Sequence, residues 1–257
     1  MRKSWVVAAI AAVVASMAAP AAAQCIKESP PHAVALLELY TSEGCNSCPP
    51  ADRWLSRIAR EGPGPDAAVP LAFHVDYWDR LGWKDRFASA RFSERQQALA
   101  RQAGSRAVYT PGVFFNFQEF RGWGSARFDD ALRAVNGKPA RADIRLELNT
   151  LSEAQLALKA DFRMMAPNKG HAFVALYENR LSTDVKGGEN RGVTLQHDYV
   201  VREWIGPIEI AGSVELRRTL ALQGDWKTSD LGVAAFVQDA AGREVLQATA
   251  LAVCVKG

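Results

Sequence analysis

Two cysteines separated by two residues lie between an apolar segment and a helical pattern near the start of the chain. The apolar segment, residues 33–40, reads AVALLELY, which is typical of a buried strand. Turn-forming residues follow it, then Cys45-Asn46-Ser47-Cys48, then Pro49-Pro50, where proline suits the first turn of a helix. This order restricts the fold strongly, because it places a dithiol at a helix N-terminus directly after a strand.

The position of the dithiol favours sulfur chemistry. The partial positive charge of a helix N-terminus stabilises a thiolate at Cys45, and Cys48 is close enough to form a disulfide with it. Three interpretations remain open: a redox dithiol, an inert structural disulfide, and a soft-metal site, for example for copper(I) with His74. The sequence has no second C-x-x-C pair, which excludes a four-cysteine zinc site.

Strands and helices alternate along the first half of the chain. The patterns predict strands over residues 33–40, 69–77 and 113–115, and helices after Pro49 and over residues 93–102 and 129–135. This alternation is typical of an α/β domain, which we place at residues 24–139.

The pattern changes after Gly137-Lys138-Pro139 to alternating apolar and polar residues. We expect strands over residues 144–148, 156–160, 172–178, 195–204, 214–222, 233–239 and 245–253. Their spacing predicts a second, mainly antiparallel β-sandwich-like domain over residues 140–257. The glycine-rich segment 187–192 is interpreted as a hairpin loop of that domain.

The first 23 residues read as an export signal. Arg2 and Lys3 precede a short apolar run, and Ala21-Ala22-Ala23 matches a cleavage site. We expect a secreted or periplasmic mature protein with no membrane anchor left after cleavage. Cleavage lowers the count of Lys and Arg from 31 to 29, against 28 Asp and Glu. A nearly neutral chain without a basic stripe argues against nucleic acid as a partner.

All four cysteines lie in the mature part of the chain, and export permits disulfides. The favoured pairing joins Cys45 to Cys48 and Cys25 to Cys254. The second disulfide would close nearly the whole mature chain, which stabilises the fold by about 5 kcal/mol at most on the chain-entropy model.

The segment from the first strand to the third resembles the thioredoxin superfamily, which also places a cis-proline opposite its dithiol. Thr110-Pro111, before the strand Val113-Phe114-Phe115, matches that proline. The segments LELYTSEGCNSCPPAD, FHVDYWDRLGWKDRF, SERQQALA, VYTPG and GENRGVTLQHDYVVR resemble the DUF1223 family of exported proteins more closely. That resemblance implies a thioredoxin-like domain followed by a β-rich domain, but no reaction. Gly112 departs from the glutamine expected there.

The resemblance implies roles for individual residues. Cys45 would be the exposed attacking thiol and Cys48 the resolving thiol, while Thr110 and Pro111 would border the substrate groove. Glu38 lies seven residues before Cys45, where thioredoxins keep a buried carboxylate. We expect it either to accept a proton from the resolving thiol or to be a solvated edge residue.

A second group of residues follows the strand over residues 69–77. Because sites collect at the carboxyl ends of strands, Asp76, Tyr77 and Trp78 are expected on the same sheet edge as the dithiol, where they could bind substrate. The alternative places His74 in the core and Asp76 at a helix cap, with Trp78 packed against the helix over residues 93–102.

The leading function is that of a thiol–disulfide oxidoreductase acting on protein or small-molecule thiols and disulfides. It requires no cofactor and no metal. The alternatives are a non-catalytic binding protein of the cell envelope, including one that binds copper or another metal through the two cysteines, and a purely structural module. Oligomeric state is not indicated by the sequence.

Overall fold

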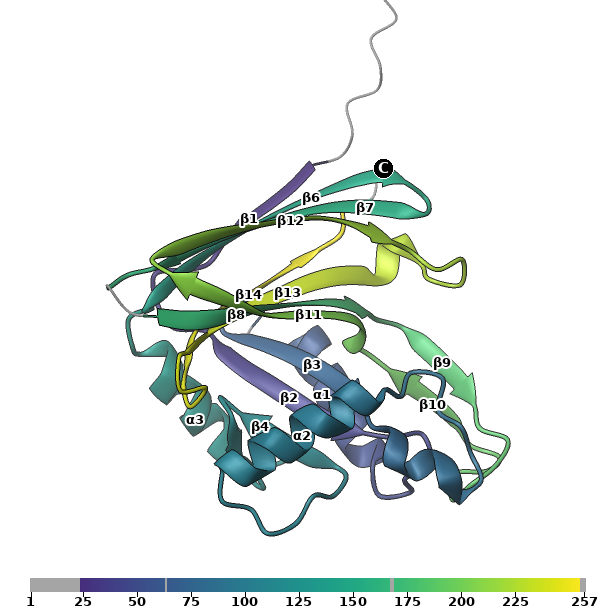
Figure 1. The fold of residues 1–257 in the computed structure, drawn as a ribbon. Helices are drawn as coiled ribbons and strands as arrows, with labels where there is room; N and C mark the ends of the chain where they lie inside the picture. Colours follow the sequence, from purple (N-terminus) through teal and green to yellow (C-terminus); the bar gives the residue numbers. More distant parts are fainter. Residues whose placement is uncertain (1–23, 63, 167–168, 255–257) are drawn as a thin grey trace, which may run out of the picture.

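The computed structural model describes residues 24–62, 64–166 and 169–254. The predicted export signal, residues 1–23, lies outside them and stays a prediction. The described part is a mixed α/β structure dominated by strands (Figure 1). Its helices are α1 (Pro49–Glu61), α2 (Ala90–Gln102) and α3 (Arg127–Asn136), with short 3-10 helices at Asp76–Leu81 and Thr228–Asp230.

The strands after residue 139 pair with one another in antiparallel fashion, as predicted. The first part of the chain contributes β1 (Gln24–Glu28), β2 (Ala35–Thr41), β3 (Ala68–His74), β4 (Gly112–Phe115) and β5 (Gln118–Glu119). The second part contributes β6 (Ala142–Ser152), β7 (Gln155–Met164), β8 (Lys169–Glu178), β9 (Leu181–Asp184), β10 (Thr194–His197), β11 (Val200–Ala211), β12 (Ser213–Ala221), β13 (Leu231–Asp239) and β14 (Val245–Ala252). The single strand expected over residues 195–204 is instead divided between β10 and β11.

One eight-stranded sheet runs through the molecule in the order β14-β13-β8-β11-β3-β2-β4-β5. Strand β3 pairs in parallel with β2 and with β11, whereas the other pairs in this sheet are antiparallel. Strands from both sides of residue 139 therefore share one sheet, and the proposed division into two domains stays a prediction.

A second sheet, β1-β6-β7-β12, packs on one face of the β8, β13 and β14 part of the large sheet (Figure 1). The core between the two sheets includes Leu146 and Phe162 from one side, and Val174, Val233 and Ala235 from the other. The packing of these apolar faces holds the two sheets together.

The two ends of the described chain meet in this part of the molecule. Strand β1 pairs with β6, and the predicted disulfide joins Cys25 of β1 to Cys254 with a Cα–Cα distance of 5.9 Å. The start of the described chain is thereby fixed to its end.

The helices cover the β2, β3 and β4 part of the large sheet on both faces. Leu37 and Leu39 of β2 face the cluster that contains α1 and α3, whereas Leu36 and Tyr40 face the cluster that contains α2. This alternation follows from the period of two in a strand, and it places Glu38 on the α2 face. No helix among the described residues is long and apolar enough to cross a membrane.

Candidate functional site

The dithiol lies in the turn between β2 and α1, as predicted. Cys45 and Cys48 form a disulfide with a Cα–Cα distance of 5.4 Å. Cys48 directly precedes Pro49, and its carbonyl accepts hydrogen bonds from the N–H groups of Ala51 and Asp52 at 2.9 and 3.1 Å. The disulfide therefore stands at the helix N-terminus, where the helix dipole stabilises a thiolate.

The expectation that Cys45 is exposed is wrong. Both cysteines are 0% exposed, whereas Asn46 and Ser47 between them are exposed. Cys45 Sγ lies 3.3 Å from Ser47 Oγ. No local pattern could indicate this burial, because the covering segments come from distant parts of the chain.

One of these segments contains Thr110 and Pro111, which the structure places beside the dithiol. Their peptide bond is cis, as the resemblance implied. The Ser47 hydroxyl donates to the Thr110 carbonyl at 3.5 Å, and Trp78 Nε1 donates to Thr110 Oγ1 at 2.7 Å. Trp78 therefore lies beside the dithiol turn, together with Thr110.

Asp76 and Tyr77 contact α2, and the Tyr77 hydroxyl also interacts with the side chain of Thr110. Ser93 Oγ donates to Asp76 Oδ1 at 2.5 Å, and the Tyr77 hydroxyl donates to Gln96 Oε1 at 3.1 Å. Gln96 also approaches Gly112 closely: a Cβ at position 112 would come within 2.8 Å of Gln96 Nε2. A glycine at that position fits this contact.

Glu38 is buried, but its carboxylate has structural partners on the α2 face. Arg95 binds it through two hydrogen bonds of 2.8 and 2.7 Å, and the Tyr40 hydroxyl donates to it at 2.7 Å. The solvated alternative for Glu38 is therefore wrong. Its proton-accepting role stays a prediction, although the carboxylate is already occupied by Arg95 and Tyr40.

A cluster of other buried ionisable side chains adjoins the dithiol turn. Each is at most 6% exposed: Glu43, Asp52, His74, Asp85 and His197. His74 Nδ1 lies 2.7 Å from Asp85 Oδ2, and His197 Nε2 lies 3.5 Å from Glu43 Oε1. The two imidazole centroids are 5.0 Å apart. His74 is thus a core residue, but one within a polar cluster.

The surroundings shift the pKa values in this cluster in different directions. Burial raises the pKa of Asp85, but the charge and hydrogen bond of His74 outweigh burial and bring it below its ordinary value. Burial lowers the pKa of His74, yet Asp85 raises it above its ordinary value overall. Burial raises the pKa of Glu43, but hydrogen bonds with His197 and Trp83 lower it, and the pKa lies below its ordinary value overall.

Asp52 differs from these residues because burial dominates and raises its pKa. Its Oδ2 atom has no hydrogen-bond partner among the described residues. Asp52 follows Cys48, the N-cap residue of α1, by four residues, which is about one helical turn. Shifted pKa values beside a dithiol are typical of functional sites.

The glycine-rich segment belongs to a loop over residues 185–193 that connects β9 with β10. Asn190 Nδ2 donates hydrogen bonds to the carbonyls of Glu43 and Cys45 at 2.8 and 2.9 Å. The backbone N–H of Asn46 donates to Glu189 Oε2 at 3.2 Å. The segment is a hairpin loop, as predicted, but it joins the separate two-stranded sheet of β9 and β10 and not the β-sandwich-like part, and it contacts the dithiol turn.

The family model described as "Protein of unknown function (DUF1223)" matches residues 36–238. The chain belongs to this family. The matched region contains the dithiol, Thr110-Pro111 and the loop over residues 185–193. The DUF1223 description supplies no reaction, so the chemistry rests on the geometry of the site.

Two solved structures resemble this DUF1223 chain, each with a TM-score of 0.65. Protein AGR_C_4864 from Agrobacterium tumefaciens is 27% identical, and the match covers 88% of this chain and 97% of that one. HBP35 of Porphyromonas gingivalis is 15% identical, with 88% and 76% covered, which shows a shared fold alone. The chain has no match among the curated proteins.

Five residues of the site were not predicted as site residues from the sequence: Glu43, Asp52, Asp85, Asn190 and His197. The sequence did contain a signal for Asp52, because a position one helical turn after Cys48 indicates that its side chain is near the dithiol. Asn190 lies within the GENRGVTLQHDYVVR segment that supports the DUF1223 resemblance, but nothing local indicates its contact with Cys45. Within the described ranges, no three or more His, Cys, Asp and Glu side chains are grouped to hold a metal ion.

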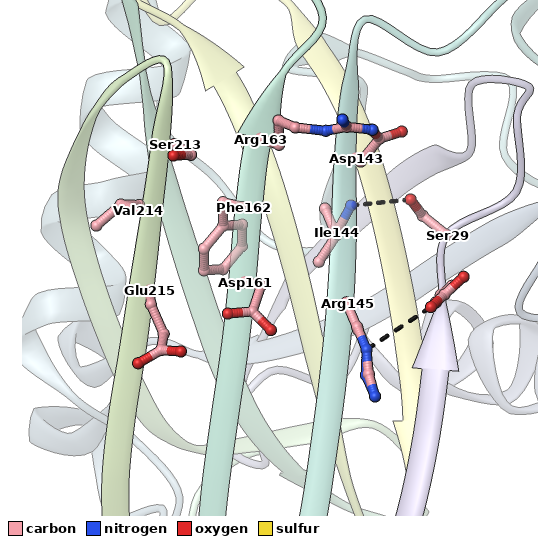
Figure 2. A pocket seen from close by; sticks show the side chains of 11 residues that line it. Ser29, Asp143, Ile144, Arg145, Asp161, Phe162, Arg163, Ser213, Val214 and Glu215 are labelled. Atoms are coloured by element: carbon pink, nitrogen blue, oxygen red, sulfur yellow. Dashed lines mark hydrogen bonds and ion pairs between the residues drawn. The ribbon is translucent and has the colours of Figure 1, made fainter.

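A hollow of about 580 Å³ lies on the four-stranded sheet, which does not carry the dithiol (Figure 2). Its charged lining residues are paired: Arg163 with Asp143 at 2.5 Å, and Arg145 with Glu28 at 3.6 Å. Cross-strand pairs of this kind are typical of a solvated sheet face. The cysteine chemistry therefore remains the better basis for a function.

Proposed function

We propose that this DUF1223 protein is an exported thiol–disulfide oxidoreductase of the periplasm or cell exterior, with a thioredoxin-like N-terminal part. The observation that carries the proposal is the Cys45–Cys48 disulfide at the N-terminus of α1, bordered by Thr110 and Trp78. The adjacent buried acid–base cluster supports it, because thiol exchange requires thiols to gain and lose protons.

The proposed reaction conserves electrons through two exchange steps. A partner thiolate attacks Sγ of Cys45, the Cys45–Cys48 bond breaks, and Cys48 leaves as a thiolate. A second thiolate of the partner then attacks the partner's sulfur in the mixed disulfide, which releases Cys45. Two electrons pass from the partner dithiol to the protein, and the reverse sequence oxidises the protein dithiol.

A trapping experiment tests this proposal. In a Cys25→Ser/Cys254→Ser background, which removes the other two thiols, we expect Cys45 of the reduced Cys48→Ser variant to attack glutathione disulfide and to retain one glutathione as a stable mixed disulfide, detected by mass spectrometry. The matched Cys45→Ser variant should accumulate little adduct. Equal labelling of both variants, or no labelling of Cys48→Ser, would contradict the assigned roles.

The burial of both sulfurs favours a second candidate, an inert structural disulfide. It predicts that neither single-cysteine variant reacts with glutathione disulfide while the protein is folded. It also predicts a large loss of stability on reduction. The trapping experiment, followed by urea unfolding of the oxidised and reduced Cys25→Ser/Cys254→Ser variant, distinguishes the two candidates, because Cys45–Cys48 is the disulfide that remains in that variant.

A further inference from the structure

We propose that the loop over residues 185–193 is a closed flap over the dithiol, and that Asn190 is the positioning residue that latches it. A partner thiol then reaches Cys45 only after the flap has moved away. This inference rests on the proposed thiol exchange, because it describes the access step of that reaction.

The latch consists of hydrogen bonds between segments about 145 residues apart. One Asn190 amide group binds the carbonyls of Glu43 and Cys45 at 2.8 and 2.9 Å, and Asn190 is only 5% exposed. Glu189 accepts the N–H of Asn46 at 3.2 Å. These hydrogen bonds hold the backbone of the dithiol turn from Glu43, before the reactive Cys45, to Asn46, after it.

The loop is carried by two strands that lie outside the large sheet. Its supporting strands, β9 and β10, form a two-stranded sheet of their own, which extends beyond β8 and β11 (Figure 1). Within the loop, the N–H of Gly192 donates to the Val185 carbonyl at 2.8 Å, and Val185 donates to the Val193 carbonyl at 3.0 Å. These internal bonds can persist while the latch breaks.

The flap also lies close to the segment that follows the 3-10 helix Asp76–Leu81. A Cβ at Gly187 would collide with the carbonyl oxygen of Gly82, and one at Gly188 would come within 3.1 Å of Trp83 Cβ. Trp83 also donates to Glu43 Oε2 at 2.8 Å, so this segment adjoins the dithiol turn, and Trp78 and Thr110 border the turn elsewhere. When the Asn190 hydrogen bonds break and the flap moves away, a partner thiol can therefore reach Cys45, which is buried in the closed structure.

The test compares Asn190→Asp with Arg191→Ala. Aspartate has nearly the size of asparagine but, when ionised, cannot donate to the two carbonyls, so the latch is lost with little change in packing. Arg191 is an exposed neighbour in the same loop. The measurement is the rate at which dithiothreitol reduces the Cys45–Cys48 disulfide, forming its own cyclic disulfide, in folded protein near neutral pH.

We expect reduction about tenfold faster in Asn190→Asp, which corresponds to about 1.4 kcal/mol, and a rate within about twofold of the original in Arg191→Ala. Urea unfolding should show that Asn190→Asp remains folded. If that variant does not fold, hydrogen exchange of the original protein provides the test: residues 43–48 and 186–192 should exchange together.

Equal reduction rates in all three proteins would overturn the flap, even if the trapping experiment supports thiol exchange. Independent exchange of the two segments would also overturn it. Conversely, faster reduction of Asn190→Asp without any glutathione trapping would support the flap and reject the oxidoreductase. The two proposals can therefore fail separately.

Discussion

Asp52 and Asp85 are both buried carboxyl groups near the dithiol, yet their surroundings act on folding in opposite ways. His74 stabilises the charged form of Asp85, whereas burial without an equivalent partner disfavours the charged form of Asp52. A lowered pKa in the folded protein contributes stability when the acid is ionised, and a raised pKa reduces it.

Asparagine substitutions at these two positions should therefore have effects of opposite sign. Asp85→Asn should lower the free energy of unfolding by about 3–5 kcal/mol at about pH 6, because it leaves a buried imidazolium without its partner. Asp52→Asn should raise the free energy of unfolding at neutral pH. Urea unfolding measures both, and destabilisation by Asp52→Asn would contradict this account of its burial.

The His74–Asp85 pair also predicts a pH dependence of stability. The contribution of Asp85 is present above its ordinary pKa of 3.8 and is lost as pH falls through its lowered folded value. The contribution of His74 is present below its ordinary pKa of 6.5 and is lost as pH rises through its raised folded value. Stability from this pair should be greatest between these ordinary values.

Unfolding free energies measured across the acid and neutral range test this expectation. His74→Gln should weaken the decline on the alkaline side, whereas the raised pKa of Asp52 causes a loss of stability that begins as pH rises through its ordinary value of 3.8. If the unfolding free energy of His74→Gln declined with rising pH as steeply as that of the original protein, His74 would not retain its proton in the folded protein.

At the level of elements, Arg95 of α2 connects the two halves of the large sheet. Its guanidinium binds Glu38 of β2 and lies 4.6–5.9 Å from the centres of aromatic rings on both sides of residue 139. These rings belong to Phe73, Phe117, Phe173, Trp204 and Phe236. Desolvated cation–π contacts strengthen such a connection.

Arg95→Met should cost about 3–5 kcal/mol of unfolding free energy, because it leaves the Glu38 carboxylate buried without a counter-charge. The exposed Arg91→Met on the same helix is the matched control. In the double variant with Glu38→Gln, the loss should be smaller than the sum of the single losses. Strict additivity in urea unfolding would contradict the ion-pair assignment.

Local patterns predicted the elements better than their partners. The Cys45–Cys48 turn, the adjacent Thr110-Pro111 segment and the alternating later strands follow from short sequence spacings. Periodicity shows that Glu38 is in a strand, but it cannot show that Arg95, 57 residues later, binds it. Likewise, the Cys45 carbonyl accepts a hydrogen bond from Asn190, 145 residues away, and no local signal predicts that contact.

At the scale of the whole molecule, the Cys25–Cys254 disulfide joins residues 229 apart and ties β1 to the end of the chain. Replacing both with serine should lower the free energy of unfolding by up to about 5 kcal/mol, because the unfolded chain regains its freedom. Urea unfolding measures the loss. An unchanged stability would show that this disulfide does not restrain the unfolded chain.

The reduction potential of the Cys45–Cys48 pair tests the central proposal most directly. It can be measured in the Cys25→Ser/Cys254→Ser variant, equilibrated with glutathione or dithiothreitol buffers for long enough to allow the flap to open. The oxidoreductase account predicts a potential above about −300 mV. A much lower potential, or no reducible bond, would contradict it and favour a structural disulfide.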